Sequence, residues 1–291
     1  MKRSVGRILL SFAALAAPIL FGMLLSGAAL ADKPEPWQIG FQAPATPVAD
    51  KLQDLHTLIL WIITFVVILV LGLLGYVCVR FRAKANPVPS RTTHHTVIEI
   101  LWTVLPVVIL LVIAVPSFKL LYFQEEVPQS DLTLKVTGKQ WYWHYSYPDN
   151  GDFAFDSYVV DDKDLKDKSL HLLEVDNEVV LPVGTNVRIQ IAGDDVMHSW
   201  FVPSLAVQKY AVVGRLNEVW VNIEKEGTYY GECNQICGVN HAFMPIKVHA
   251  VSKDAFKQWV EQAKTKFARE DGTAPSSRLA SAETPAAAIA Q

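Results

Sequence analysis

Two long apolar runs near the amino terminus set the strongest limit on how this chain can fold. The first covers Leu58–Val79 and the second covers Val97–Leu121. Each exceeds the roughly 20 residues that a helix needs to cross a hydrocarbon core of about 30 Å. Buried helices of a soluble protein would be the alternative, but the first run carries no charge at all. We therefore predict transmembrane helices over residues 55–79 and 97–121.

The segment between the two runs indicates how the hairpin is oriented. Residues 80–96 carry four basic side chains and no acidic one. The nearest acid, Glu99, lies inside the second apolar run. By the positive-inside bias, this loop faces the cytoplasm. Both outer ends of the hairpin then face the exported side, so we expect residues 32–54 and everything after about Tyr122 there. This predicts a multi-pass membrane protein with both termini on the exported side.

The first 31 residues are typical of a secretory signal peptide. Lys2, Arg3 and Arg7 precede a long apolar stretch, and Ala29-Leu30-Ala31 fits a small-x-small cleavage site. An uncleaved signal anchor is the alternative. The polar sequence that follows favours cleavage, so we predict a signal peptide over residues 1–31.

Residues 130–250 have the pattern of an all-β domain. Short runs rich in Val, Ile, Tyr and Trp are separated by Gly, Pro, Asn and Asp. About 120 residues of this kind favour one sandwich or barrel. The periodicity then changes to that of a helix over residues 252–268, with Ser252 as the expected N-cap. The Ala-, Ser- and Pro-rich tail, residues 270–291, is predicted to be disordered.

The stretch GECNQICGVNHAFM holds two of the three cysteines, Cys233 and Cys237, followed by His241 and Met244. In an exported domain a disulfide between the two cysteines is the ordinary interpretation. A disulfide, however, requires neither the histidine nor the methionine. Thiolate, imidazole and thioether together form a donor set for copper rather than for calcium, magnesium or a typical structural zinc.

A copper site of this kind needs a second histidine. His198 lies in GDDVMHSWFVP, just after the strand-like run NVRIQIAG, and we expect a loop there that brings it to the cysteines. His144, His171 and His249 are the alternatives. An ordinary loop histidine remains the competing interpretation of His198 at this point.

Three motifs together resemble subunit II of the haem–copper oxidases of the cytochrome c oxidase type. They are HSW–x(32)–C-x-x-x-C-G-x-N-H-x-x-M-P, the membrane-helix motif EILWTVLP and the run GKQWYWHYSYP. The resemblance extends from about Asp50 to Val260. It implies a two-helix transmembrane hairpin with an all-β, cupredoxin-like Greek-key barrel that holds a dinuclear copper A centre.

The resemblance also implies a ligand for each position of the copper centre. Two thiolates would bridge both copper ions, two imidazoles would each cap one ion, and a thioether and a backbone carbonyl would be weak ligands. In the same order these ligands are Cys233, Cys237, His198, His241, Met244 and the carbonyl of Gln235. The family often has Glu in place of Gln235 and uses it for a magnesium ion at the boundary with subunit I. A neutral amide adds no charge to such a site, so magnesium is in doubt here.

Further residues acquire roles only through the resemblance. Trp141 would be the tryptophan through which electrons enter, and Asp156, Asp176 and Asp195 would bind cytochrome c. Residues 149–178 contain ten acidic side chains and three lysines, a charge that would steer a basic partner. Glu99 would stand at the mouth of a proton path into subunit I. A solvated carboxylate at the membrane surface is the alternative for Glu99.

The predicted function is the subunit of a terminal respiratory oxidase that receives electrons. It would take them from cytochrome c and pass them through copper A to haem in subunit I, where oxygen is reduced. Subunits I and III and the membrane are the expected partners, and nucleic acid is not. A copper-free quinol-oxidase subunit and a membrane-tethered copper carrier are the alternatives. The absence of C-x-x-C-H argues against a fused c-type haem.

Overall fold

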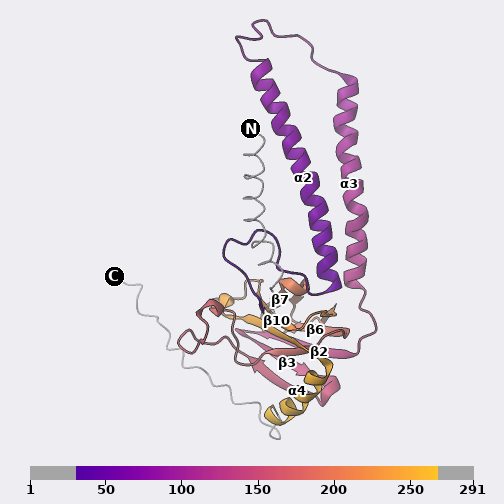
Figure 1. The fold of residues 1–291 in the computed structure, drawn as a ribbon. Helices are drawn as coiled ribbons and strands as arrows, with labels where there is room; N and C mark the ends of the chain where they lie inside the picture. Colours follow the sequence, from indigo (N-terminus) through magenta and orange to yellow (C-terminus); the bar gives the residue numbers. More distant parts are fainter. Residues whose placement is uncertain (1–30, 268–291) are drawn as a thin grey trace, which may run out of the picture. The chain divides into compact units, whose positions relative to one another are not determined.

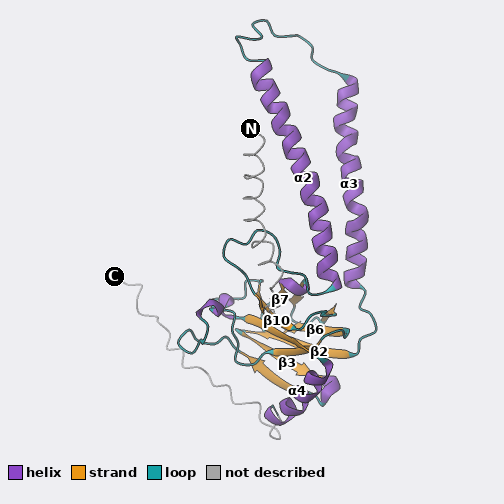
Figure 2. Cartoon of the chain, in the orientation of Figure 1, coloured by secondary structure: helices purple, strands orange, loops and turns teal. Residues whose placement is uncertain are grey.

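The computed structural model describes residues 31–267, beginning with the two-residue strand β1 (Ala31–Asp32). The signal peptide predicted over residues 1–31 therefore lies almost wholly outside the described residues, and so does the tail predicted over residues 270–291. Figure 1 follows the chain by sequence colour and Figure 2 separates its helices from its strands. Both figures show a helical hairpin and a β domain.

The hairpin consists of α2 (Pro47–Arg80) and α3 (Thr96–Glu125), and both helices are longer than the apolar runs predicted. Their polar first turns are stabilised by caps, because Thr46 accepts from the Ala49 amide and His95 accepts from the Ile98 amide. Within the described residues, these two helices are long and apolar enough to cross a membrane. The connecting loop is accordingly shorter than the predicted 80–96.

The β domain contains two sheets. One has the order β4-β3-β2-β6-β9, and the main path of the other has the order β5-β11-β10-β7-β8. The strands are β2 (Leu132–Lys139), β3 (Tyr142–Tyr147), β4 (Phe153–Ser157), β5 (Val179–Pro182), β6 (Val187–Gly193), β7 (His198–Val202), β8 (Val207–Ala211), β9 (Asn217–Val221), β10 (Gly227–Cys233) and β11 (Pro245–Val251).

Neighbouring strands in each sheet are often far apart in sequence. The β2–β6 pair is parallel, with Leu132 opposite Val187, and so is the β11–β5 pair, with Val248 opposite Val179. The remaining pairs on these paths are antiparallel. The chain thus passes repeatedly between the two sheets, as in the Greek-key, cupredoxin-like domain expected from the sequence.

The sequence did not predict β4, β7 or β8, and the omission of β7 changes the setting of His198. This residue was expected in a loop, but it is the first residue of β7. Four of the five residues of β7 are buried, so the strand lacks the alternation that identifies a half-buried strand. His198 therefore has its backbone fixed by a strand rather than carried by a loop.

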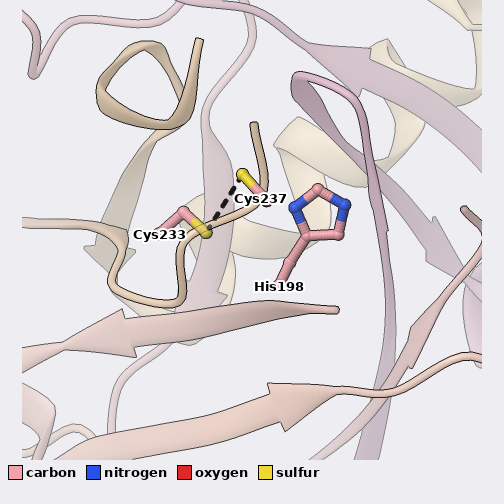
Figure 3. A group of neighbouring side chains, drawn as sticks. All are labelled: His198, Cys233 and Cys237. Carbon is pink, nitrogen blue, oxygen red and sulfur yellow. Dashed lines mark hydrogen bonds between the residues drawn. The ribbon is translucent and has the colours of Figure 1, made fainter. Parts of the chain in front are cut away.

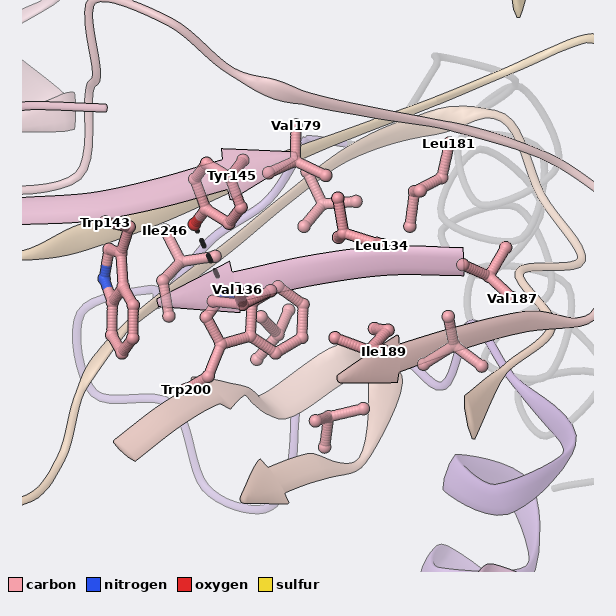
Figure 4. Close-up of a cluster of buried hydrophobic side chains, with 14 of the residues drawn as sticks. Leu134, Val136, Trp143, Tyr145, Val179, Leu181, Val187, Ile189, Trp200 and Ile246 are labelled. Atoms are coloured by element: carbon pink, nitrogen blue, oxygen red, sulfur yellow. Dashed lines mark hydrogen bonds between the residues drawn. The ribbon is translucent and has the colours of Figure 1, made fainter. Parts of the chain in front are cut away.

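The core lies between the two sheets, where apolar side chains from both meet (Figure 4). Leu134 and Ile189 alternate with more exposed residues on β2 and β6, as expected for strands with one buried face. Trp200 crosses the core and its indole N–H donates to the Tyr145 hydroxyl at 3.2 Å. This bond satisfies both buried polar groups and fixes the packing between the sheets.

The last helix, α4 (Lys253–Lys266), covers one end of the β domain. Ser252 caps it by accepting from the Ala255 amide at 3.2 Å. The Trp259 ring lies 5.2 Å from that of Tyr147, and the Phe267 ring lies 4.7 Å from that of Phe155. Aromatic packing of this kind closes that end of the domain.

Candidate metal centre

Two adjacent strands bring His198 to the cysteines. β7 begins with His198 and β10 ends with Cys233, and the two strands pair so that Cys233 stands opposite Trp200. The chain then turns through Cys237 and returns as β11. Figure 3 shows the three side chains together, with one imidazole nitrogen of His198 on the side of the two sulfur atoms.

Both cysteines are free thiols in a buried setting. Their sulfur atoms are 3.9 Å apart, which is about twice the 2.05 Å of a covalent disulfide. The ordinary interpretation of an exported cysteine pair is therefore not the arrangement found. Two sulfur atoms at this separation can instead be ligands of the same metal ion.

The imidazole of His198 completes a compact group of three donors. One donor atom from each of His198, Cys233 and Cys237 lies within 4.8 Å of the others. The Nδ1 atom of His198 is buried and has no hydrogen-bond partner, while Nε2 lies 2.9 Å from the carboxylate of Asp195. Unpaired buried polar atoms are rare in proteins, so this nitrogen is a position where a metal ion fits.

The other predicted ligands lie around the two sulfur atoms. The Cys237 sulfur is 3.5 Å from Nδ1 of His241 and 3.6 Å from the thioether of Met244. The Cys233 sulfur is 3.3 Å from the backbone oxygen of Gln235. All six predicted positions therefore meet at this end of the domain, although His241 stands outside the tight group of three.

The two thiols have opposite pKa shifts. Burial raises the pKa of Cys233, but the contact with His198 and nearby backbone amides outweigh it and lower the pKa overall. The pKa of Cys237 rises to about 12 because of burial and the neighbouring Cys233 charge. Burial lowers the pKa of His198, but Cys233 and Asp195 raise it overall. Two close thiolates are thus unfavourable without a cation, which agrees with a metal-binding role.

Residues around this group hold the loop that carries Cys237. Its carbonyl accepts from the Gln140 side chain at 2.9 Å and from the Trp141 indole N–H at 3.2 Å. Gly238 has a φ of 125°, and a Cβ there would lie 2.8 Å from the Trp141 ring. Trp141 thus packs directly on the loop, and only glycine fits beside it.

The three carboxylates predicted to bind cytochrome c have different surroundings. Asp195 is engaged, because it bonds His198 and accepts from the Gln140 amide at 2.6 Å. Asp156 lies 2.7 Å from Nδ1 of His144. Asp176 is exposed and accepts from the Tyr158 amide at 2.8 Å. Asp176 and Asp195 are thus both exposed residues with hydrogen-bonded carboxylates, whereas Asp156 is half-buried.

Glu99 lies far from these residues in sequence, in the first turn of α3. It is half-buried, and its carboxylate accepts from the His95 amide at 2.9 Å. This places it as part of the helix N-terminus, where a negative charge is stabilised.

Sequence reasoning missed two residues that position the group. Gln140 supports the Cys237 carbonyl, and Asp195 orients the His198 ring, although only docking was expected of it. The spacing of Asp195 and His198 was the available signal, since metal-binding histidines commonly donate the N–H of their second ring nitrogen to a carboxylate. Gln140 had no such signal, because its contact depends on a loop distant in sequence.

Two protein-family models match the chain. The model for the periplasmic domain of cytochrome c oxidase subunit II matches residues 132–251, and the model for its transmembrane domain matches residues 34–120. The matched regions coincide with the β domain and the helical hairpin. The two helices are thus those of a membrane-anchored protein.

Individual proteins similar to this chain are also cytochrome c oxidase subunits 2. A probable cytochrome c oxidase subunit 2 of Rickettsia felis is 49% identical over 238 residues, which are 82% of this chain and 76% of that protein. The mitochondrial cytochrome c oxidase subunit 2 of Vigna unguiculata is 50% identical over 238 residues, covering 80% of this chain and 63% of that protein.

A crystal structure of the periplasmic domain of subunit II of cytochrome oxidase from Bradyrhizobium japonicum is also similar. It is 50% identical with a TM-score of 0.46, and the match covers 49% of this chain and all of that one. With two family models and relatives of about half identity along most of its length, this chain belongs to the cytochrome c oxidase subunit II family, whose members are subunits of a terminal oxidase.

Proposed function

We propose that the chain receives electrons from cytochrome c at a dinuclear copper A centre and passes them to haem in subunit I. The observation that carries the proposal is the group of His198, Cys233 and Cys237, with its buried, unpartnered imidazole nitrogen. Soft sulfur and nitrogen donors favour copper over hard cations. A copper-free subunit would have no need of these donors, which disfavours the quinol-oxidase alternative.

Each residue of the group has a distinct part in this proposal. Cys233 and Cys237 would supply bridging thiolates, His198 and His241 terminal imidazoles, and Met244 and the Gln235 carbonyl weak contacts. A bound pair of copper ions would supply one-electron transfer with the charge shared between two metals. Asp195 fixes the orientation of His198, and buried surroundings exclude water from the sulfur atoms. Magnesium is not part of the proposal, because Gln235 offers only a neutral amide.

Metal analysis and electron-spin resonance of the purified oxidase would test this centre. We expect two copper ions in the exported domain of this subunit and hyperfine coupling to two equivalent copper nuclei. A spectrum of a single copper ion, or a Cys233–Cys237 disulfide in the active enzyme, would contradict the proposal.

Electrons would enter through Trp141, whose indole N–H bonds the carbonyl of Cys237 and so links the domain surface to the metal loop. The acidic residues, among which Asp176 and Asp195 are exposed, would attract the basic face of cytochrome c. Trp141→Phe should slow electron transfer while leaving cytochrome c binding unchanged.

Asp176→Asn should weaken the binding of cytochrome c mainly at low salt, where screening is least. Unchanged kinetics in both variants would remove this docking face.

Glu99 would collect protons at the cytoplasmic end of α3 for the oxygen chemistry of subunit I. Its half-buried carboxylate at a helix N-terminus supports this role. Glu99→Ala should slow oxygen reduction without changing copper content or reduction by cytochrome c. Wild-type turnover in this variant would leave Glu99 as a capping residue only.

This assignment requires one orientation in the membrane. The β domain would be periplasmic in a bacterial inner membrane, beside subunits I and III, with both termini on that side. The basic connector between α2 and α3 supports it. Protease added from the periplasmic side should cleave the β domain and spare this connector, and the reverse pattern would overturn the orientation.

A further inference from the structure

The segment that leads into α2 is bonded to the β domain on both sides of its backbone. The Ala45 amide donates to the Ser204 carbonyl at 3.0 Å, and the Ala45 carbonyl accepts from the Glu224 amide at 3.0 Å. The Ser204 hydroxyl also bonds the Gln42 side chain at 2.7 Å. Ala45 and Ser204 are buried. A flexible tether would not engage both backbone groups of one residue in this way.

Thr46 joins the membrane helix to the β domain through a single hydroxyl. Its oxygen accepts from the Ala49 amide at 3.1 Å, which caps α2, and its hydrogen is donated to the Leu205 carbonyl at 3.0 Å. Thr46 is only 1% exposed. Both hydrogen-bonding capacities of the hydroxyl are therefore used in a dry setting, where an unmade bond is most unfavourable.

Apolar and charged contacts extend this junction to the second helix. Val48 of α2, Leu120 of α3 and Trp220 of β9 form a buried cluster. The Phe123 ring lies 5.5 Å from the Trp220 ring at an angle of 79°. In addition, Lys209 of β8 pairs with Glu125 at 3.1 Å. Both ends of the hairpin therefore contact the same edge of the β domain.

Strand β7 and the short helix that follows it connect the metal group to the junction. Leu205 ends the short helix η3 (Pro203–Leu205), which directly follows β7, and β7 begins with His198. β7 is hydrogen-bonded between β8 and β10, so it is held on both sides. Because β7 is fixed within its sheet, a shift of the Leu205 carbonyl relative to Thr46 would move the sheet that carries His198 and Cys233 relative to α2.

We propose that Thr46 is a positioning residue, whose hydroxyl holds strand β7 and the metal group at a fixed place relative to the membrane helices. This proposal rests on the proposed electron-transfer function. The neighbouring subunit that holds the acceptor haem packs in the membrane, so the junction sets the distance and orientation between copper and haem. Because the rate of electron transfer falls as donor and acceptor move apart, we expect the step from copper to haem to slow when this junction is loosened.

Thr46→Val tests the proposal in the intact oxidase, because it keeps the shape of the side chain and removes both hydrogen bonds. Thr46→Ser keeps the hydroxyl, and Thr57→Val is a matched control whose hydroxyl bonds only the Gln53 carbonyl within α2. Rapid kinetics would measure reduction of copper by cytochrome c and of haem by copper, each relative to the copper signal.

We expect Thr46→Val to slow only the step from copper to haem, with a normal copper spectrum, and Thr46→Ser and Thr57→Val to behave as wild type. Equal rates in all variants, or an effect confined to the cytochrome c step, would overturn the proposal. If Thr46→Val does not assemble, Ser204→Ala removes the milder contact with Gln42 and must show the same selective slowing.

Amide hydrogen exchange gives a readout that does not depend on copper. Exchange at the Ala49 and Glu224 amides should accelerate in Thr46→Val and not in Thr57→Val, since both amides bond across this junction or its cap. An oxidase without copper would refute the proposed function, while unchanged exchange would refute the junction, so the two failures are distinguishable.

Discussion

One end of the β domain holds the sulfur side chains and the other is packed with aromatic rings, and β3 runs from one end to the other. Near one end Trp143 donates to the Met244 carbonyl beside the sulfur atoms, and at the other end Tyr147 lies among the aromatic rings of α4. At the aromatic end the Tyr147 hydroxyl is fully engaged, since it donates to the Val180 carbonyl and accepts from the Val180 amide. At the sulfur end the Nδ1 atom of His198 is buried and unpaired.

The aromatic end therefore contributes mainly to the stability of the domain, and the sulfur end mainly to its chemistry. The aromatic end gains free energy from packing alone and needs nothing from outside the chain. The sulfur end holds two thiols with opposite pKa shifts and an unpaired nitrogen, an arrangement that a bound cation would stabilise. Changes at the sulfur end should therefore affect metal binding first, and changes at the aromatic end should affect unfolding first.

The largest expected effect is loss of the metal centre in Cys233→Ser. A serine hydroxyl is a poor ligand for copper, so the dinuclear copper signal should disappear entirely. The fold should persist, because packing at the aromatic end is untouched. Metal analysis, electron-spin resonance and circular dichroism would measure these outcomes.

Cys78→Ser is the matched control, since Cys78 is exposed on α2 and distant from the sulfur group in sequence. It should retain two copper ions. If Cys233→Ser kept an unchanged copper signal, the sulfur end would not be the metal site.

A large effect on stability is expected at the opposite end in Phe256→Ala. Phe256 is 7% exposed, and its ring packs on Tyr147 and Trp259. Removing a buried phenyl ring costs about 3–5 kcal/mol of the free energy of unfolding. Denaturant titration followed by tryptophan fluorescence would measure this loss.

The copper spectrum of Phe256→Ala should equal that of wild type under native conditions. A changed spectrum without lost stability would show that the two ends are coupled, contrary to the comparison drawn above.

The sequence predicted the sulfur end better than its supports. Cys233, Cys237, His241 and Met244 lie close together in the chain, so their spacing alone indicated a metal site. His198 was expected to lie close to the cysteines, and its imidazole is within 4.8 Å of both sulfur atoms. The strand β7 that carries it was missed, because burial on both faces hides the period of a strand.

Roles that depend on partners distant in sequence were harder to predict. Asp195 was assigned to docking, yet its carboxylate is bonded to His198 and to the Gln140 amide. The cap at Thr46 and its bond to Leu205 join residues far apart in the chain, so no local pattern indicates them. Groups of ligand residues close together in the sequence could be predicted, whereas contacts between residues far apart in the sequence could not.

A smaller effect on stability is expected from Tyr147→Phe, which sharpens the picture of the aromatic end. The hydroxyl donates to the Val180 carbonyl at 2.9 Å and accepts from its amide at 3.1 Å. Removing it leaves two buried backbone groups unpaired, which costs about 1–3 kcal/mol. Tyr210→Phe, at a residue that is 44% exposed, is the control and should leave the unfolding midpoint unchanged. Equal midpoints for both variants would mean that water replaces the lost bonds at Val180.

The smallest effect is expected at neither end, but on the outer face of β11. His249 lies 3.0 Å from Glu178, and Lys247 lies 3.1 Å from Glu178 and 2.6 Å from Glu174. The hydrogen bond with Glu178 raises the pKa of His249 above its ordinary value, despite opposing contributions from burial and from Lys247.

Because the folded pKa of His249 exceeds the unfolded value of about 6.5, the stabilisation is full below that pH and is lost as pH rises through the folded pKa. The His249 side chain is 42% exposed, so solvent and salt reduce the effect. Compared with His249→Gln, wild type should gain stability at pH 6 and lose that advantage by pH 8, as measured by thermal unfolding at both values. Parallel unfolding curves at the two pH values would show that His249 is already free of Glu178 in solution, and a larger advantage at pH 8 would reverse the sign derived from its pKa.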